Sequence, residues 1–339
     1  MMRVLVAMSG GVDSSVAAAL LLEQGHEVTG VTMRLWGGPS DSGCCSASDV
    51  DDARRVAQQL DVAHYVFDYE DDFERHVVGP YVEAHREGRT PNPCVECNRH
   101  LKFDRLLDRA DELGFDVLAT GHHARVVRRD GRAALARAVD VAKDQSYVLH
   151  VLPPATLERC RFPVGELTKA EVRSMAEDLG LRTADKPESQ DVCFVTASDG
   201  RATFLGDRIP LRPARLVDTA GAAVGSVDAI ELVTIGQRRG LGLAGAAERR
   251  FALDVDVRAG EVTVGTADEL LVDATPLRDP VVHEPVTTAL VQTSAHGRPA
   301  RARLDGAVLR WDEPRPRVAP GQSVVLYDGD VVVGGAIAA

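Results

Sequence analysis

A glycine-rich run between an apolar strand and a helix constrains the fold of this chain more than any other feature. Val4–Met8 is a continuous apolar segment, which predicts a buried parallel strand. Ser15–Gln24 predicts a helix that ends at Gly25. Between them, Gly10 and Gly11 let the backbone turn tightly, while serine hydroxyls and the helix N-terminus supply donors to an anion. The sequence therefore predicts a phosphate-binding junction between strand and helix.

The run from Ser9 to Ser14 differs from the two common phosphate loops. It lacks the Lys-Ser/Thr ending of a P-loop and the third glycine of a dinucleotide fingerprint. The sequence SGGVDSS instead resembles the PP-loop of the ATP pyrophosphatases, which split ATP between its α and β phosphates and use AMP to activate a substrate oxygen. A glycine-rich turn without a ligand is the alternative, and the preceding strand, Asp13 and the serines disfavour it.

Strands and helices alternate through the first half of the chain. Such alternation predicts an α/β fold with a parallel, Rossmann-like sheet, helices on both faces and ligands at the carboxyl ends of the strands. The loops Ser9–Ser14, Arg34–Ser46 and Gly121–His123 all follow strands and should share one rim. The other expected strands are Glu27–Met33, His64–Phe67 and Val117–Thr120, and the expected helices are Ser48–Leu60, Asp72–Glu87, Asn98–Leu113 and, after a capping box at Thr168, Lys169–Leu179.

The pattern changes after about residue 200. Phe204–Ala244 is rich in glycine and proline and contains the segment TIGQRRGLG at residues 234–242. Apolar and polar residues then alternate, and the Asp328-Gly329 turn is a strong hairpin signal. The expected hairpin strands are Phe251–Val257 with Glu261–Gly265, and Gln322–Tyr327 with Val331–Gly335. We therefore predict a Rossmann-like PP-loop domain at residues 1–200, a small central domain at 201–260 and a C-terminal β-barrel at 261–339.

Positive charge is unevenly distributed in this chain, whose net charge is −12. One basic stripe covers Gly121–Lys143. A second consists of Arg298, Arg301, Arg303, Arg310, Arg315 and Arg317. An acidic protein with two basic stripes fits local RNA binding, and a solvated surface is an equal alternative. Only four of the 39 basic residues are lysines, which indicates positions where a compact ammonium group is needed. These are Lys102, Lys143, Lys169 and Lys186.

Hydropathy and cysteine usage both indicate a cytoplasmic protein. No apolar run has membrane-spanning length and the chain enters a strand at once, so we expect no signal peptide and no membrane partner. The six cysteines then act as reduced thiols rather than as a disulfide framework. Cys160 is interpreted as a packed small hydrophobic residue. Cys44 and Cys45 are interpreted as loop residues over the ATP site, with a redox role as the alternative.

Three other cysteines carry the expected thiol chemistry. Cys94 and Cys97 form a CxxC pair at the start of a helix, where the macrodipole favours the thiolate. Cys193 lies further along the chain in SQDVCF. A CxxC pair alone fits a redox pair, half of a zinc site or ligands of a cluster. The zinc interpretation is disfavoured, because no second pair with suitable spacing occurs.

Several short segments of distinctive sequence are spread along the whole chain. In order, they are SGGVDSSV, TPNPCVECN, LKFD, ATGHHA, KDQSYVL, the Cys193 segment, TIGQRRGLG and PGQSVVLYDGDVVVGGA. The same order is found in the tRNA-specific 2-thiouridylases, which the chain resembles over essentially its full length. KDQSYVL and TIGQRRGLG are far more specific signals than a glycine motif alone.

The resemblance implies that ATP activates a uridine in the anticodon stem-loop of tRNA. The C2 oxygen of the wobble uridine 34 would be adenylated with release of pyrophosphate, because a carbonyl oxygen leaves poorly and an AMP ester leaves readily. Mg²⁺ would neutralise the phosphates during this step. The implied nucleotide-binding residues are Ala7, Met8, Ser9, Gly10, Gly11, Val12, Asp13, Ser14, Met33 and Gly121.

The resemblance also implies a route for sulfur. A persulfide on Cys193 would be supplied by a sulfur-donor protein, either a cysteine desulfurase or a sulfur carrier. Its sulfur attacks C2 directly or is released as sulfide by the nucleophile Cys97, which leaves a Cys97–Cys193 disulfide. The target base must leave the anticodon stack to react. The resemblance implies that the central domain and the C-terminal β-barrel both contact tRNA. The residues implied to contact it are Asn92, Pro93 and Cys94 around the base, and His122, Lys143, Asp144, Gln145, Arg303 and Gln322 elsewhere.

Cys94 departs from the family pattern. Many members carry an aspartate at this position, viewed as a general base, and a cysteine does not play that part unchanged. If Cys94, Cys97 and Cys193 converge, three thiolates could hold a 4Fe–4S cluster with one open iron that carries sulfide. The persulfide route needs only Cys97 and Cys193, and both routes stand as hypotheses.

Two other classes of function compete with this interpretation. The first is another PP-loop ATP pyrophosphatase, such as an amidating synthetase or a uridine-8 thiolase. An amidating synthetase has no use for three cysteines, and the extra RNA-binding and rhodanese-type segments usual in a uridine-8 thiolase are not recognisable in this sequence. The second is a tRNA-binding module that holds ATP only as a structural ligand, which pyrophosphate release dependent on tRNA would exclude.

Overall fold

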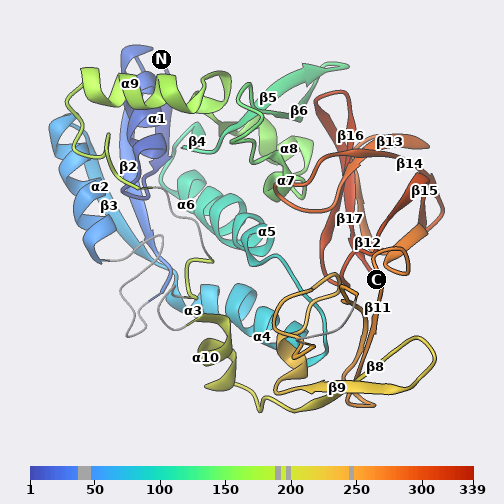
Figure 1. The fold of residues 1–339 in the computed structure, drawn as a ribbon. Helices are drawn as coiled ribbons and strands as arrows, with labels where there is room; N and C mark the ends of the chain where they lie inside the picture. Colours follow the sequence, from blue (N-terminus) through green and yellow to red (C-terminus); the bar gives the residue numbers. More distant parts are fainter. Residues whose placement is uncertain (37–46, 188–191, 196–199, 244–247) are drawn as a thin grey trace. The chain divides into compact units, whose positions relative to one another are not determined.

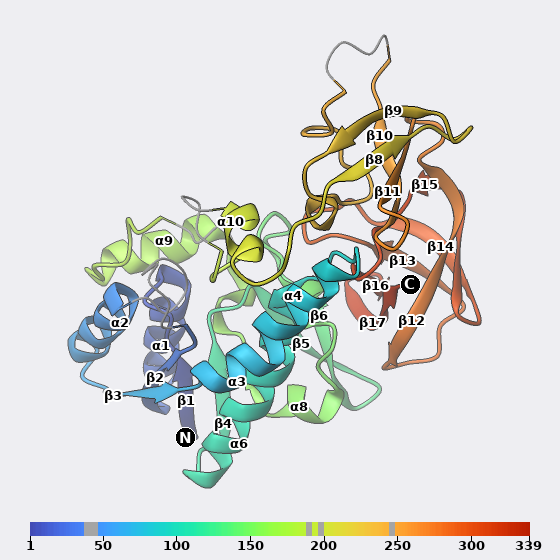
Figure 2. The ribbon, with the colours of Figure 1, turned by 90° about the horizontal axis from the view of Figure 1, so that it is seen from below.

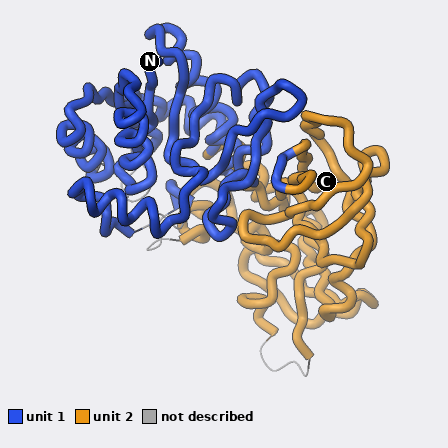
Figure 3. The backbone as a smooth tube through the Cα atoms, turned by 90° about the horizontal axis from the view of Figure 1, so that it is seen from above, with its two compact units in different colours: residues 1–77, 93–197, 330–332 blue, residues 78–92, 198–329, 333–339 orange. Residues whose placement is uncertain are grey.

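The computed structural model describes residues 1–36, 47–187, 192–195, 200–243 and 248–339. They divide into two compact units (Figure 3), unit 1 with residues 1–77, 93–197 and 330–332, and unit 2 with residues 78–92, 198–329 and 333–339. The predictions for Cys44 and Cys45 lie outside the described residues. Within the described ranges, no helix combines the length and apolar character needed to cross a membrane.

Unit 1 is built on a five-stranded parallel sheet with the order β3-β2-β1-β4-β7 (Figure 1), which confirms the predicted Rossmann-like α/β fold. The apolar run of β1 occupies the centre, where Val6 is fully buried and aligned with Gly30 and Ala119 on the flanking strands. Because β2 and β4 lie on opposite sides of β1, the strand order reverses there, at the position where such sheets bind ligands. The strands are β1 (Arg3–Ala7), β2 (Glu27–Arg34), β3 (Ala63–Asp68), β4 (Val117–Thr120) and β7 (Cys160–Arg161).

The predicted helices are present, and two of them contain π-helical stretches. These are η1 (Glu74–Val78) and η2 (Cys97–Arg105). The capping box is confirmed, since the Thr168 hydroxyl accepts from the Glu171 N–H and the Glu171 carboxylate accepts from the Thr168 N–H. The remaining helices of this region are α1 (Val12–Glu23), α2 (Ala47–Gln59), α3 (Glu70–Phe73), α4 (Gly79–Arg86), α5 (Pro93–Glu96), α6 (Leu106–Glu112), α7 (Ser146–Leu149), α8 (Pro154–Glu158), the 3-10 helix η3 (Pro163–Glu166) and α9 (Lys169–Asp178).

Part of the first basic stripe forms a hairpin that was not predicted. β5 (Ala124–Arg129) and β6 (Arg132–Arg137) pair around Asp130-Gly131, where both residues have positive φ. Positive φ at both central positions is typical of the tight turns that join antiparallel strands. Several arginines of the stripe are neutralised within unit 1: Arg128 pairs with Glu158, and Arg137 pairs with Asp144 at 3.0 Å.

The first part of unit 2 is a four-stranded sheet with the order β10-β11-β8-β9. Its apolar residues, among them Leu216, Ile230 and Val262, form a separate core. The predicted hairpin of β10 and β11 is confirmed, and β11 also pairs with β8. The elements are α10 (Gly200–Gly206), β8 (Ala214–Val217), β9 (Ala223–Val227), the 3-10 helix η4 (Ile230–Leu232), β10 (Phe251–Asp256) and β11 (Glu261–Gly265).

The strands after β11 form a closed antiparallel barrel, coloured orange to red in Figure 2. Six strands run in the order β12-β15-β14-β13-β16-β17, and pairing of β12 with β17 closes the barrel. Inward-facing residues such as Val291, Trp311 and Leu326 fill its core. The predicted hairpin at Asp328-Gly329 joins the last two strands. The strands are β12 (Leu271–Val282), β13 (Thr288–Gln292), β14 (Ala300–Asp305), β15 (Val308–Pro316), β16 (Ser323–Asp328) and β17 (Val331–Ala338).

Candidate active site

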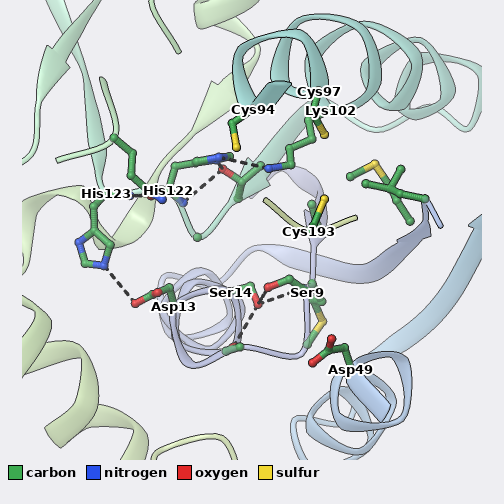
Figure 4. A pocket seen from close by; sticks show the side chains of 18 of the residues that line it. Ser9, Asp13, Ser14, Asp49, Cys94, Cys97, Lys102, His122, His123 and Cys193 are labelled. Carbon is green, nitrogen blue, oxygen red and sulfur yellow. Dashed lines mark hydrogen bonds and ion pairs between the residues drawn. The ribbon is translucent and has the colours of Figure 1, made fainter. Parts of the chain in front are cut away.

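The loop between β1 and α1 forms the floor of a pocket of about 320 Å³ in unit 1 (Figure 4). Gly10 has φ +71°, and a Cβ at this position would lie 2.2 Å from the carbonyl oxygen of Asp49. Only glycine fits a left-handed conformation with backbone packed so closely against it. The start of α2 therefore lies directly against the loop, and the tight turn expected from the sequence is present.

Serine hydroxyls hold this loop in shape. The Ser9 N–H donates to the Ser14 hydroxyl at 3.2 Å, and the Ser14 and Ser15 hydroxyls donate to the Gly11 carbonyl at 3.2 and 2.8 Å. These bonds join both ends of the loop through the hydroxyls of Ser14 and Ser15. The first N–H groups of a helix have no acceptor within it, so the start of α1 at Val12 offers donors to an anion in the pocket.

Asp13 joins two distant segments at the pocket. Lys169 Nζ donates to both carboxylate oxygens of Asp13 at 2.7 Å, and His123 Nε2 lies 3.0 Å from Oδ1. Burial alone would raise the pKa of Asp13, but the hydrogen bonds from His123 and Lys169 outweigh it and lower the pKa below its usual value. Asp13 is therefore ionised at neutral pH and fixes Lys169, the first residue of α9, beside the loop.

Lys186 makes a second set of contacts on the other side of the loop. Its Nζ donates to the Gly10 carbonyl at 3.0 Å, to Asp49 at 2.6 Å and to Asp52 at 2.7 Å. Burial alone would lower the pKa of Lys186, but the hydrogen bonds to Asp49 and Asp52 raise it above its usual value. The residue thus joins the PP-loop, the start of α2 and the segment that leads toward Cys193.

All four lysines of the chain line this one pocket. Lys102, on η2, lies with its Nζ 3.5 Å from Nε2 of His122, and Lys143 follows the β5–β6 hairpin. Burial, and then the charge of Lys102, lowers the pKa of His122 well below its usual value. His122 is therefore neutral at pH 7, and the ammonium groups provide the positive charge of the pocket.

Three cysteines line the same pocket as the loop. Cys94 is exposed, Cys97 is buried and Cys193 is intermediate. Figure 4 shows Cys94 and Cys97 on neighbouring turns of one helix, with Cys193 on a separate segment. Among the described residues, no group of three or more His, Cys, Asp or Glu side chains is arranged to hold a metal ion. Cys160 is buried in β7 outside the pocket, and burial raises the pKa of its thiol to about 12, so it fits the packing role expected from the sequence.

Most of the residues expected to bind ATP or the target base are gathered in this pocket. Gly10 does not line the pocket, because it packs against the backbone of Asp49 at the start of α2. Asp144 is also absent from the wall, because its buried carboxylate accepts from Arg137, Ser146 and the Ala138 N–H. The expected residues that line the pocket are Ala7, Met8, Ser9, Gly11, Val12, Asp13, Ser14, Met33, Pro93, Cys94, Cys97, Gly121, His122, Lys143, Gln145 and Cys193.

Three of the expected tRNA-binding residues belong to unit 2. These are Asn92, Arg303 and Gln322. Arg303 is exposed on β14, opposite Arg310 of β15, and the Gln322 amide donates to the Thr90 carbonyl at 2.6 Å. Gln322 therefore holds the segment that precedes Asn92.

Sequence reasoning gave no role to His123, Asp49, Lys169 or Lys186, all of which line the pocket. The scarcity of lysine was the one signal that pointed to the last two. His123 and Asp49 could not be singled out, because their contacts depend on the packing of segments far apart in the chain.

Comparison with known proteins covers nearly the whole chain. Family models match residues 2–197 as a tRNA methyl transferase HUP domain, 202–266 as a tRNA methyl transferase PRC-barrel domain and 287–338 as an aminomethyltransferase beta-barrel domain. Relatives named tRNA-specific 2-thiouridylase MnmA are 49% identical in Chloroflexus aurantiacus, over 99% of this chain and 98% of the relative, and 45% identical in Mycobacteroides abscessus, over 99% of both. A third, from Carboxydothermus hydrogenoformans, is 44% identical over 98% of this chain and 96% of the relative. With the PP-loop and three thiols in one pocket, this chain therefore belongs to the family of tRNA-specific 2-thiouridylases.

Proposed function

We propose that this protein replaces the C2 oxygen of the wobble uridine 34 of tRNA with sulfur, at the expense of ATP. One observation carries the proposal: the phosphate-binding loop and the thiols Cys94, Cys97 and Cys193 line a single pocket. A phosphate loop alone fits any ATP pyrophosphatase, and thiols alone fit a redox protein. Their combination fits a reaction in which ATP activates an oxygen and a thiol delivers the atom that replaces it.

Phosphate recognition rests on the loop backbone and on the lysines. The N–H groups at the start of α1 supply donors for a triphosphate, and the four lysines of the pocket wall supply positive charge, part of which Asp13, Asp49 and Asp52 neutralise at Lys169 and Lys186. Mg²⁺, when it accompanies ATP, neutralises phosphate charge. Among the described residues of the pocket wall, the carboxylates are those of Asp13 and Asp49, and both are paired with lysines, so we assign neither as a metal ligand.

The first step forms an AMP ester of the uridine. The C2 oxygen attacks the α phosphorus of ATP, the bond between the α phosphorus and the bridging oxygen breaks, and pyrophosphate leaves with the electron pair. Positive charge held beside the loop stabilises the charge that develops on the departing pyrophosphate. His122 is neutral and buried in the pocket wall, with Nδ1 2.6 Å from the Thr120 hydroxyl and Nε2 3.5 Å from Lys102 Nζ, so it adds no positive charge for binding phosphate.

The second step transfers sulfur from a persulfide on Cys193, which a sulfur-donor protein supplies. The terminal sulfur attacks C2 and AMP leaves with its oxygen. The Cys97 thiolate then attacks the Cys193 sulfur, the persulfide bond breaks, and the outer sulfur stays on C2 as the thiocarbonyl. A Cys97–Cys193 disulfide results, and an external dithiol must reduce it by two electrons before the next turnover.

A 4Fe–4S cluster on Cys94, Cys97 and Cys193 is the other hypothesis for sulfur delivery. The described side chains are not arranged as a metal site, so we derive no step through iron. Iron and sulfide analysis of protein purified without oxygen decides between the routes. Active protein that contains no iron supports the persulfide route, and activity proportional to bound iron contradicts it.

The deciding experiment separates adenylation from sulfur transfer. Pyrophosphate release and 2-thiouridine are measured with tRNA, ATP and a persulfide donor, the latter by mass analysis of nucleosides at position 34. We expect Cys97→Ser and Cys193→Ser to abolish 2-thiouridine while tRNA-dependent pyrophosphate release continues. Cys160→Ala is the matched control, because this buried thiol lies outside the pocket and its loss should leave both signals unchanged.

Other outcomes would contradict the proposal. Product that requires ammonia instead of persulfide would identify an amidating synthetase, and sulfur at uridine 8 would identify a different thiolase. ATP bound without tRNA-dependent pyrophosphate release would leave only a binding module. The proposed reaction also places the protein in the cytoplasm with its tRNA and its sulfur donor, and capture of a desulfurase or sulfur carrier by the purified protein would test that partnership.

A further inference from the structure

The proposed reaction ends with an oxidised pair of cysteines at a poorly accessible position. Its second step joins Cys97 to Cys193 in a disulfide, and a dithiol from outside the protein then has to attack one of the two sulfur atoms. Cys97 is only 8% exposed, and Cys193 is half-buried. Cys94, in the wall of the same pocket, is exposed. The thiol that an external reductant reaches best is therefore not a member of the pair that needs reduction.

The local structure places Cys94 next to Cys97. They lie three residues apart on one uninterrupted helical stretch, in which α5 continues directly into η2. Residues at this separation lie on one face of a helix with their Cα atoms about 5 Å apart, and a disulfide needs Cα atoms about 4.4–6.8 Å apart. Val95 is buried and the Asn98 amide donates to the Val148 carbonyl at 3.0 Å, so the backbone of this turn is held in place. Rotation of the two cysteine side chains is thus sufficient to join them.

Cys193 comes to the same pocket from a different segment. The next residue, Phe194, is 2% exposed and packs against Phe73 and Trp36, with ring centroids 5.7 and 6.2 Å away. This aromatic cluster fixes the backbone beside Cys193, whose thiol lines the pocket together with the CxxC pair. Figure 4 shows the sulfur atoms of that pair directed from the helix toward the segment of Cys193, and the Cys193 sulfur directed toward the helix. Cys97 therefore has one disulfide partner within reach on its own helix and another on the facing segment.

We propose that Cys94 is the resolving cysteine of this protein, the thiol that takes over the disulfide formed during sulfur transfer. The Cys94 thiolate attacks the sulfur of Cys97, the Cys97–Cys193 bond breaks, and Cys193 leaves with the electron pair as a thiolate. The proton that Cys94 gives up is balanced by the one that Cys193 takes up, and the disulfide moves to the Cys94–Cys97 pair without any net change in electrons. An external dithiol then attacks the exposed Cys94 sulfur, transfers two electrons and is itself oxidised to a disulfide. This role rests on the proposed function, because sulfur transfer is what oxidises Cys97 and Cys193.

The exchange separates sulfur loading from reduction. Cys193 regains its thiolate as soon as the disulfide has moved, so a donor can load the next persulfide while Cys94 and Cys97 are still oxidised. An aspartate at position 94 cannot take part in such an exchange, because it has no sulfur. The cysteine that departs from the family pattern therefore has a role that the aspartate does not have.

The first test traps the disulfide formed in a single turnover. The protein is mixed with tRNA, ATP and a limiting amount of persulfide donor without a reductant, the remaining thiols are alkylated, and disulfides are mapped by peptide mass spectrometry. We expect a Cys94–Cys97 disulfide and alkylated Cys193. Cys94→Ser should instead accumulate the Cys97–Cys193 disulfide. Cys160→Ala is the matched control and should give the same map as the unaltered protein, since Cys160 is buried outside the pocket.

The second test measures how fast the trapped disulfide is reduced. Thioredoxin serves as a protein-sized dithiol, and dithiothreitol serves as a small one that enters the pocket. We expect thioredoxin to reduce Cys94→Ser at least about tenfold more slowly than the unaltered protein, and dithiothreitol to reduce both at similar rates. A purely structural role of Cys94 would slow both reductants or neither. Circular dichroism confirms that Cys94→Ser is folded.

Two results of these tests would overturn the inference. One is formation of 2-thiouridine with Cys97–Cys193 as the only disulfide in the unaltered protein, and the other is equally fast reduction of Cys94→Ser and the unaltered protein by thioredoxin. Failure of the proposed function is distinguishable, because it abolishes 2-thiouridine itself. A further arm needs no thiolation: oxidised glutathione should close the Cys94–Cys97 pair in Cys193→Ser. Absence of that disulfide would overturn the inference whether or not 2-thiouridine is formed.

Discussion

At the scale of single residues, Gly10 is the position with the least freedom to change. Its φ is positive and a Cβ added there would lie 2.2 Å from the Asp49 carbonyl oxygen, so Gly10→Ala must displace backbone. We expect a loss of about 3 kcal/mol or more in stability together with loss of nucleotide binding. Gly11→Ala is the control, because its Cβ would meet only the Ser9 hydroxyl, at 3.4 Å. Thermal unfolding of the two variants checks this, and equal losses would contradict it.

The pair Asp13 and Lys169 allows stability and activity to be separated. Lys169→Met removes the ammonium group from a partly buried carboxylate, which should cost about 1–3 kcal/mol and raise the pKa of Asp13. Adding Asp13→Asn removes the carboxylate charge that has lost Lys169 and should restore most of the stability, while tRNA-dependent pyrophosphate release stays low. Urea unfolding and pyrophosphate assays measure the two effects, and recovery of activity in the double variant would show that neither charge is needed.

The sequence was sufficient to predict the loop but not its partners. Two glycines, a preceding apolar strand and a following helix lie within about twenty residues and act locally. Lys169 reaches Asp13 across 156 positions, and Lys186 reaches Gly10 across 176. The first contact follows from how α9 packs against α1 and the second from the segment that follows α9, and no local pattern encodes either. The charge of the first basic stripe was overestimated for the same reason. Arg128 and Arg137 pair with Glu158 and Asp144, and these pairs cannot be recognised from the sequence of the stripe.

At the scale of elements, the capping box of α9 sets the position of Lys169. Thr168→Ala removes the hydroxyl that accepts from the Glu171 N–H and should lower stability by about 1 kcal/mol. Because Lys169 is the next residue, fraying of this turn should also weaken ATP binding. Ser174→Ala, at an exposed position in the same helix, should be neutral or slightly stabilising. Thermal unfolding and nucleotide titration test the pair, and equal effects would show that the cap does not matter.

Element types were more predictable than their local geometry. The alternating apolar and polar residues on both sides of Asp328-Gly329 correctly predicted a hairpin. Asp130-Gly131 is the same turn signal, but we interpreted the residues around it only as a basic stripe and missed the hairpin of β5 and β6. The helix predicted at 98–113 exists, yet Cys97–Arg105 has π-helical turns. A π-helical turn depends on packing and on side-chain contacts. The spacing of apolar residues over a segment this short does not distinguish it from an α-helical turn. The predicted domain boundaries remain predictions.

At the scale of the whole molecule, buried histidines make stability depend on pH. Burial lowers the pKa of His85 to about 4, and His122 is also shifted downward. The unfolded chain binds protons at these sites below about pH 6.5, so the folded state loses stability as pH falls through this range. Between pH 7.5 and 5.5 we expect a loss of about 1 kcal/mol for each such histidine. Urea unfolding at the two pH values measures this loss of unfolding free energy. We expect His85→Gln to reduce it by about 1 kcal/mol and His296→Gln, at an exposed position, to leave it unchanged. An equal loss in both variants and in the unaltered protein would contradict the assignment to His85.

The confinement of lysine to one pocket has a chemical consequence for the entire protein. Apart from the N-terminus, every primary amine of the chain lies where the triphosphate is proposed to bind. An acylating reagent such as an N-hydroxysuccinimide ester should therefore modify the exposed N-terminus and this pocket, and inactivate the protein through the pocket, where peptide mass spectra should show protection by ATP. Labelling unaffected by ATP would place the nucleotide elsewhere. The extent of lysine acylation in this protein therefore measures the fraction of molecules whose proposed active site holds a nucleotide.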